Sequence, residues 1–208
     1  LDDQQLMTEV DELVQNLLNT KPAVRVSYQQ AFLNELNIDP LTATLQQLKD
    51  FIVQSSSDDW LQQENEKQVL LQWLFSMKIE PHLGKQQDGF VPCFVYDFPA
   101  EQAALAKFNQ QDPRVAHRFE LYYQGVELAN GFYELQNAQE QKTRFDQDNQ
   151  QRQQTGLATK PIDQNFLAAL EAGLPDCSGV ALGIDRLFML AIGQPQISQV
   201  LTFDINRA

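Results

Sequence analysis

The most constraining feature of this chain is a pair of alternating stretches joined by a very short turn. Residues 118–123 and 126–135 alternate polar and apolar side chains and contain several aromatic residues, a pattern typical of half-buried strands. Gln124-Gly125 separates them, and a two-residue connection that contains glycine is typical of a β-hairpin. The sequence therefore predicts two antiparallel strands, and the rest of the fold must pack around this hairpin.

The turn sets which residues of the two strands face each other. Tyr122 would lie opposite Glu127. Glu120 would lie opposite Ala129, so that both glutamates point to one face of the hairpin. Two carboxylates so close repel each other unless a cation lies between them, and Mg2+ prefers oxygen ligands and often bridges to phosphates. We therefore predict Glu120 and Glu127 as ligands of Mg2+.

A second alternating set follows on the same strand, formed by Asn130, Phe132 and Glu134. Strict alternation would place this set on the face opposite to Glu127, but residues 129–131 are a plausible β-bulge that would bring all of them onto the carboxylate face. We predict that bulge. The resulting pocket, with an acid, an amide and an aromatic wall, suits a long cationic ligand such as a lysine side chain. The alternative is an edge hairpin whose polar face meets water.

Residues 178–186 predict a further strand with an unusual face. Alternation places three apolar residues on its core face: Val180, Leu182 and Ile184. The other face carries only small residues: Gly179, Ala181 and Gly183. A strand face without side chains is unfavourable in packing and in chain entropy, which favours a flat ligand such as a purine lying against it. Close packing of a helix is the alternative explanation.

The helix expected after this strand begins with an unfavourably placed cation. Asp185 is well placed to cap the helix, whereas Arg186 lies in its first turn, where the helix dipole disfavours a positive charge. An anionic ligand would explain the arginine, and together these features suggest an ATP site. The glycine-rich phosphate loops of the common nucleotide folds are absent from the sequence. His82 and His117 are isolated, and we expect structural roles for both.

The remaining pattern predicts an α+β fold, and a length of 208 residues fits one large domain or two small ones. Residues 1–90 are expected to form mainly helical support, and residues 91–208 the sheet and the ligand site. The opening helix would bury Leu6, Val10, Leu13 and Leu17. Further helices are expected at 28–36, 44–53, 60–77, 137–154, 163–172 and 185–192, and a strand at 90–98. Met77 is expected on the buried face of the fourth helix.

Charge and composition exclude several classes of protein. The 208 residues carry a formal charge of −13, and an acidic surface repels nucleic acids, so we expect no tRNA partner. No apolar run approaches the ~20 residues that span a bilayer and no signal peptide opens the chain, so we expect a cytoplasmic protein without a membrane partner. Cys93 and Cys177 lack metal-type spacing and are expected to be free thiols. Because the chain begins with Leu1, we expect a fragment or a processed product.

Four segments together resemble a known family: Phe119-Glu120, 125–135, Gly173-Leu174-Pro175 and 179–186. They are similar to the C-terminal part of the class II lysyl-tRNA synthetase catalytic core, and the closing Gly-Ile-Asp-Arg element resembles that class's motif 3. The resemblance is stronger to synthetase paralogues that lack an anticodon-binding domain and ligate β-lysine onto a lysine of elongation factor P. It covers essentially the whole chain and implies that residues 1–208 are the C-terminal part of a single catalytic domain. The implied fold is an antiparallel sheet flanked by helices, truncated at the N-terminus.

The resemblance also implies roles for individual residues. It assigns ATP binding to Glu120, Glu127, Leu128, Gly183 and Arg186. Among these, Glu120 and Glu127 would hold Mg2+, and Arg186 would be the catalytic residue near the terminal phosphate. It assigns the amino-acid pocket to Asn130, Phe132, Glu134 and Ala181, with Glu134 binding the distal ammonium.

The implied function is an ATP-dependent ligase that activates lysine or β-lysine as an adenylate and transfers it to a lysine of elongation factor P. Ala181 favours the paralogue, because lysyl-tRNA synthetases carry glycine at the matching position. Motifs 1 and 2 should precede Leu1, so we expect this chain alone to be inactive or severely weakened, and the full-length protein to be a homodimer. The alternatives are a lysyl-tRNA synthetase core fragment and a non-catalytic lysine-binding module.

Overall fold

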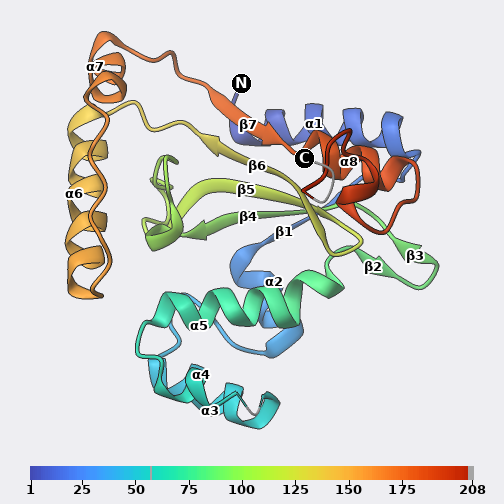
Figure 1. Cartoon of the computed structure of the whole chain (residues 1–208), viewed down its shortest axis with the longest axis horizontal. Helices are drawn as coiled ribbons and strands as arrows, with labels where there is room; N and C mark the ends of the chain where they lie inside the picture. Colours follow the sequence, from blue (N-terminus) through green and yellow to red (C-terminus); the bar gives the residue numbers. More distant parts are fainter. Residues whose placement is uncertain (57, 206–208) are drawn as a thin grey trace.

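The computed structural model describes residues 1–56 and 58–205, so Ser57 and residues 206–208 of the expected domain lie outside the described part. Its centre is a five-stranded sheet with the strand order β1-β4-β5-β6-β7 (Figure 1). The strands are β1 (Val24–Ser27), β4 (Cys93–Pro99), β5 (Val115–Tyr123), β6 (Val126–Tyr133) and β7 (Ser178–Leu182). All neighbours pair antiparallel except β1, which runs parallel to β4. The predicted α+β class is therefore confirmed, although β1 lies in a region expected to be helical.

One face of the sheet is covered over β1 and β4 by a layer of helices. They are α2 (Tyr28–Leu36), α3 (Leu45–Ser55), α4 (Asp59–Gln63) and α5 (Lys67–Leu74), continued by a π-helix at Phe75–Ile79 and a 3-10 turn at Glu80–His82. A small hairpin follows, β2 (Lys85–Gln86) with β3 (Gly89–Phe90). Side-chain caps begin two of the helices, because Ser27 and Thr44 accept hydrogen bonds from Gln30 and Gln47 backbone N–H groups. Aromatic rings of Tyr28, Phe32, Phe75, Phe98 and Tyr122 fill the core beneath.

The single helix expected over residues 60–77 is wrong in one respect, because it is interrupted after Gln63. The carboxylate of Glu64 accepts hydrogen bonds from the backbone N–H groups of Asn65 and Glu66, at 2.7 and 2.8 Å, and this local bonding replaces the helical pattern. Met77 is also not buried, since its exposed fraction is 58%. The π-helix at Phe75–Ile79 shifts the helix face, which turns Phe75 and Ile79 into the core.

The other face of the sheet is covered by α1 (Asp3–Leu18) and α8 (Ile184–Ala191), which lie side by side in Figure 1. The buried apolar residues of α1 are Met7, Val10 and Val14. Leu13 and Leu17 are exposed, so the predicted buried face is displaced by about one residue around the helix. The core here joins these residues to β4, β5, β6 and β7.

The start of α8 also differs from the prediction. Strand β7 ends at Leu182, and Gly183 is the N-cap of the helix, without a side-chain hydrogen bond. Asp185 therefore does not cap the helix. Ile184 is 65% exposed and not in the core, because it is already a helical residue and no longer follows the alternation of the strand.

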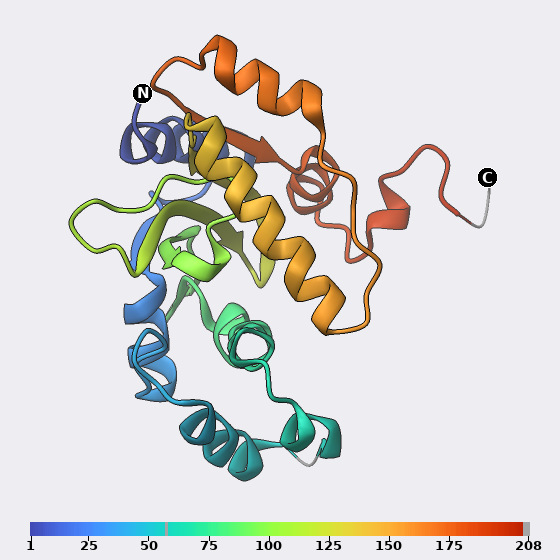
Figure 2. The same ribbon diagram turned by 90° about the vertical axis from the view of Figure 1, so that its left-hand side faces the viewer.

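Two further helices form an outer layer beside the sheet (Figure 2). They are α6 (Ala138–Gln154) and α7 (Gln164–Ala172), both close to their predicted bounds, and they meet through Phe145 and Phe166, whose ring centroids are 6.1 Å apart. Short 3-10 turns lie at Ala100–Gln102 and Ile197–Gln199. Within the described residues, every helix falls short of the length and apolarity needed to cross a membrane. Cys93 and Cys177 are free thiols, as predicted.

A polar contact joins α1 to the sheet. The Nδ1 atom of His117 on β5 lies 3.3 Å from Oδ2 of Asp3, which is nearly buried. This hydrogen bond raises the pKa of His117. Burial opposes ionisation of Asp3, but the hydrogen bond and charge of His117 bring the pKa of that carboxyl below its usual value. His117 therefore has the structural role expected for it.

This contact predicts a pH dependence of stability. The contribution of His117 is complete below its unfolded pKa of about 6.5 and is lost as the pH rises through its higher folded value. The contribution of Asp3 to stability is complete above its unfolded pKa of about 3.9 and is lost as the pH falls through its lower folded pKa. Between these limits, wild type should exceed Asp3→Asn by about 1 kcal/mol in unfolding free energy, with a smaller difference outside them. Urea unfolding across pH 3–9 tests this, with exposed Asp185→Asn as a control; a pH-independent difference would contradict it.

Candidate active site

The hairpin of β5 and β6 contains the predicted bulge, but at a different residue. Tyr122 pairs with Glu127 as expected, whereas Glu120 pairs with Asn130 and not with Ala129. The register shift between Leu121 and Tyr122 leaves Leu128 as the extra residue of β6, so the bulge lies just before the predicted 129–131. It has the predicted effect, since it brings the second alternating set onto the face of Glu120.

This bulge and the pairing of β6 with β7 assemble the predicted residues on one face of the sheet. Asn130 pairs with Ala181, and Phe132 pairs with Gly179. Phe132 also lies opposite Arg118 of β5. Residues paired directly across a sheet point to the same face. The face thus carries Arg118, Glu120, Tyr122, Glu127, Asn130, Phe132, Gly179 and Ala181.

Leu128 does not share this face. Its side chain is buried in the opposite core with α1 and α8. Its carbonyl oxygen accepts a hydrogen bond of 2.8 Å from the backbone N–H of Gly183. Leu128 could therefore line a ligand only through its backbone, and its structural task is to hold the start of α8 against β6.

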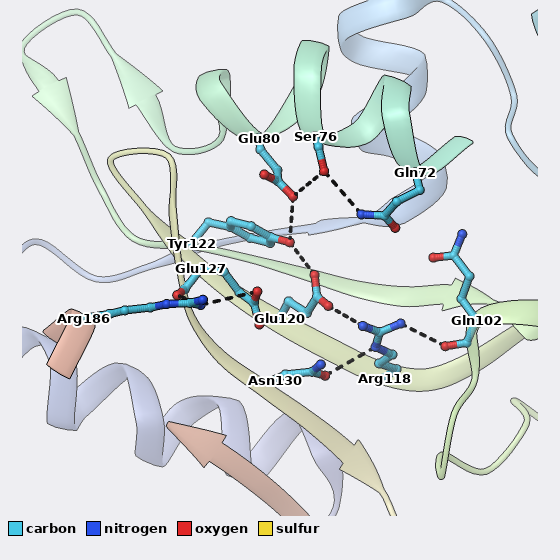
Figure 3. A network of polar contacts seen from close by, with 10 residues as sticks. All are labelled: Gln72, Ser76, Glu80, Gln102, Arg118, Glu120, Tyr122, Glu127, Asn130 and Arg186. Carbon is cyan, nitrogen blue, oxygen red and sulfur yellow. Dashed lines mark hydrogen bonds and ion pairs between the residues drawn. The ribbon is translucent and has the colours of Figure 1, made fainter. Parts of the chain in front are cut away.

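Glu120 is the most buried carboxylate on the site face, with 6% of the residue exposed. Its two oxygens accept short hydrogen bonds from the Arg118 guanidinium and the Tyr122 hydroxyl (Figure 3). Arg118 is fixed in turn, because it donates to the Gln102 carbonyl at 2.9 Å and to Asn130 Oδ1 at 3.3 Å. The cation that balances Glu120 within the chain is thus Arg118.

The network continues from Tyr122 toward α5. The Tyr122 hydroxyl lies 3.4 Å from Glu80 Oε1, which accepts a hydrogen bond of 3.2 Å from Ser76 (Figure 3). Burial raises the pKa of Glu120, and the nearby charges of Glu127 and Glu80 add to this against the opposing effect of Arg118. Burial likewise raises the pKa of Glu80. The carboxylates of Glu80, Glu120 and Glu127 repel one another. This part of the site therefore favours binding of a further cation.

Glu127 and Arg186 meet at the other end of the network. Arg186 Nη1 donates to the Glu127 carbonyl at 2.8 Å and lies 3.5 Å from its Oε2 atom. The contact with Glu127 partly offsets the unfavourable position of Arg186 in the first turn of α8. The Arg186 side chain is nevertheless 47% exposed, so its guanidinium remains accessible to an anion.

Glu134 differs from the other acids, because its carboxylate has no hydrogen-bond or ion-pair partner in the described part of the chain. The residue is half-buried, and burial raises the pKa of its carboxyl. A Cβ atom built on Gly179 would lie 2.5 Å from Glu134 Oε1. Gly179 therefore makes room for this carboxylate, which is a different reason for the glycine from the predicted flat floor for a base.

Ala181 keeps its predicted position on the strand, whereas Gly183 lies beyond the end of β7 as the N-cap of α8. Ala181 is exposed on the site face opposite Asn130. A Cβ atom on Gly183 would lie 3.4 Å from Arg186 Cδ and 3.5 Å from the Leu128 carbonyl oxygen, which are ordinary contacts. Packing within the described chain therefore does not require glycine at position 183.

The whole arrangement is an antiparallel sheet face with acids, an arginine at a helix start and an unpaired carboxylate beside an aromatic ring. A family model described as tRNA synthetases class II (D, K and N) matches residues 3–207. The chain belongs to this family. Class II synthetase membership agrees with the predicted resemblance and with the α+β architecture.

Curated relatives within this class II family carry a more specific description. The chain is 53% identical over 203 residues to the elongation factor P--(R)-beta-lysine ligase of Salmonella typhi. The matched residues make up 98% of this chain and 61% of the relative. The chain is 52% identical, with the same coverage, to the protein of the same name from Klebsiella pneumoniae (strain 342). The chain therefore spans about three-fifths of the length of the curated relatives that it matches.

Sequence reasoning missed three members of the site of this class II protein: Arg118, Tyr122 and Glu80. Two of them could have been found, since Arg118 and Tyr122 flank Glu120 at two-residue spacing and so share its face of the strand. Glu80 had no such signal, because it reaches the network from a different element across 42 residues of chain.

Proposed function

We propose that the complete protein is an ATP-dependent ligase that activates lysine or β-lysine as an aminoacyl-adenylate and transfers it to a lysine of elongation factor P. The names of the curated relatives support this acceptor. The single observation that supports a lysine-type substrate is the half-buried carboxylate of Glu134, which has no ion-pair partner among the described residues and lies over Gly179, the residue paired with Phe132. Such a carboxylate is stabilised by a ligand cation, because the ion pair offsets its desolvation.

The amino-acid substrate would extend along the face of β6 and β7. Its distal ammonium would bind Glu134, its aliphatic stem would pack on Phe132, and Asn130 would offer an amide to its polar end. Ala181 lies opposite Asn130, so its methyl group would narrow this part of the site. One methyl group in a pocket changes discrimination between substrates by ~1–3 kcal/mol, which makes Ala181 a selectivity residue.

ATP would bind at the opposite end, between β6 and the start of α8. Glu120 and Glu127 would hold Mg2+ together with phosphate oxygens, since this ion usually takes one or two carboxylates. The described residues include no cluster of three metal-ligating side chains, so the protein would supply only a pair of carboxylates, with phosphate oxygens and water as the other ligands. The mutual repulsion of Glu80, Glu120 and Glu127 favours a cation beside this pair. Bound Mg2+ would supply positive charge to the phosphates. Leu128 through its backbone and Gly183 would line the nucleotide, and Arg186 would bind the terminal phosphate.

The chemistry then has two steps. The substrate carboxylate attacks the α-phosphorus of ATP, the bond to pyrophosphate breaks, and an acyl-adenylate forms. The side-chain amine of the acceptor lysine then attacks the acyl carbon, AMP leaves, and the amine loses a proton as the amide forms. Arg186 would stabilise the charge that develops on the leaving pyrophosphate.

ATP–pyrophosphate exchange by the complete protein tests this proposal. We expect exchange that depends on lysine or β-lysine and on Mg2+, followed by stoichiometric AMP release when elongation factor P is added. Charging of tRNA in place of elongation factor P would favour a lysyl-tRNA synthetase. Binding of lysine without AMP release would favour a non-catalytic module, and either result would contradict the proposed ligase.

A further inference from the structure

A long groove leads away from the polar network of the site. It consists of two adjoining cavities of about 920 and 950 Å3 that share Val69 of α5 and Asp148 of α6 on their walls. Arg118 and Ser76 line the first cavity, so the groove begins at residues of the candidate site. The second cavity continues it along α6 to Phe166 of α7.

The walls of this groove carry large apolar side chains that the chain leaves exposed. They are Trp60 (51% exposed), Val69 (39%), Met77 (58%), Phe108 (39%) and Leu157 (56%). Single exposed apolar residues are normal on protein surfaces, whereas several along one concave feature are typical of an interaction site. Apolar contacts alone do not define a partner.

The charges of the groove restrict what it can bind. Five carboxylate residues line it: Glu64, Glu66, Glu101, Asp148 and Asp163. Four basic residues line it as well, and two of them are neutralised, because Arg118 pairs with Glu120 and Arg144 pairs with Glu140. The other two, Arg152 and Lys160, form no ion pair with a described residue, so the groove has five unpaired acidic residues and two unpaired basic ones. Glu101 and Asp148 form no ion pair with any described residue. A groove with unpaired carboxylates repels nucleic acid and attracts a basic partner.

We propose that this groove is the docking surface for the acceptor protein of the ligase, and that it binds a basic segment with apolar side chains next to the acceptor lysine. The proposal rests on the proposed function, because it assumes a protein acceptor. Arg118 lines the inner end of the groove and bonds to Asn130 on the site face. A segment lying in the groove would therefore direct its lysine amine toward the activated substrate.

The test measures binding of elongation factor P to the complete protein by calorimetry, without ATP, so that it does not depend on catalysis. We expect the double variant Glu101→Lys/Asp148→Lys to raise the Kd at least ten-fold at physiological salt. The matched control, Glu9→Lys/Glu12→Lys, changes the net charge equally on exposed positions of α1, which covers the opposite face of the sheet. It should leave the Kd within two-fold of wild type.

Three results would overturn the docking proposal. They are no binding of elongation factor P by the wild-type protein, an equal effect of the groove and control variants, and a groove variant that alters self-association of the protein alone. The third would indicate that a second copy of the chain occupies the groove. Failure of pyrophosphate exchange despite groove-dependent binding would contradict the proposed ligase function and still support the docking surface.

Discussion

Replacing Glu134 with glutamine should weaken binding of lysine or β-lysine to the complete protein by at least about 30-fold. Loss of one partner of a desolvated charge pair typically removes ~2–5 kcal/mol of binding free energy, and each ~1.4 kcal/mol is ten-fold in affinity. The neutral amide keeps the size of the carboxylate and removes only its charge. Isothermal calorimetry with the free amino acid measures this effect directly.

The same change should not destabilise the fold. Burial raises the pKa of Glu134, so the folded chain binds this proton more readily than the unfolded chain does. The charged form therefore opposes folding fully above the higher, folded pKa, and this penalty declines as the pH falls through that value and is absent below the unfolded pKa. At neutral pH the unfolding free energy of Glu134→Gln should equal or slightly exceed that of wild type.

Two further variants test whether the loss of affinity comes from the missing Glu134 carboxylate and not from the loss of any acidic side chain. Gly179→Ala would place a methyl group 2.5 Å from Glu134 Oε1 and so displace the carboxylate, which should also lower affinity. Glu171→Gln alters an exposed carboxylate on α7 and should leave affinity unchanged. Affinity of Glu134→Gln within two-fold of wild type would remove the basis for a lysine-type substrate.

Replacing Arg118 with methionine should lower the unfolding free energy by about 3–5 kcal/mol, the range expected when one partner of a buried ion pair is removed. Methionine retains much of the aliphatic stem but removes the guanidinium, which is the counter-charge of Glu120 and whose Cζ lies 4.5 Å from the centre of the Phe98 ring. Glu120 would then remain buried with only the Tyr122 hydroxyl as a partner. Urea unfolding of the wild type and the variant measures this difference.

A second substitution tests whether the uncompensated charge is the cause. The double variant Arg118→Met/Glu120→Gln should recover a large part of the lost stability, because the buried carboxylate is gone. The exposed pair of Lys142 and Asp146 is the control, since Lys142→Met should change stability by less than about 1 kcal/mol. A loss below 1 kcal/mol for Arg118→Met would show that Glu120 is balanced by other groups.

The hairpin shows how far local patterns reach. The alternation around Gln124-Gly125 predicts both strands and their turn, and the Tyr122–Glu127 pair follows directly from it. The position of the bulge does not follow, because several residues near Asn130 could be inserted without changing the turn. The bulge falls at Leu128 because the side chain of this residue is buried against α1 and α8. Those helices lie far from Leu128 in the sequence, so the local pattern does not reveal this contact.

The expected core faces show the same limit. The helix of α1 was predictable from its spacing, yet burial of Met7 and Val14 in place of Leu13 and Leu17 depends on how the helix sits on the sheet. Strand β1 was missed because its four residues alternate over too short a run to distinguish a strand, and its parallel pairing with β4 joins segments some 70 residues apart.

The amino-acid sequence by itself determined the turn, the two strands of the hairpin and the chemical types gathered near the site, because turn formation and alternation act over a few residues. The tertiary structure alone decided that Arg118 balances Glu120, that Glu80 joins them, and that Gly179 makes room for the Glu134 carboxylate. These features arise between elements distant in the chain, where burial and close packing select one arrangement among many that the local sequence allows.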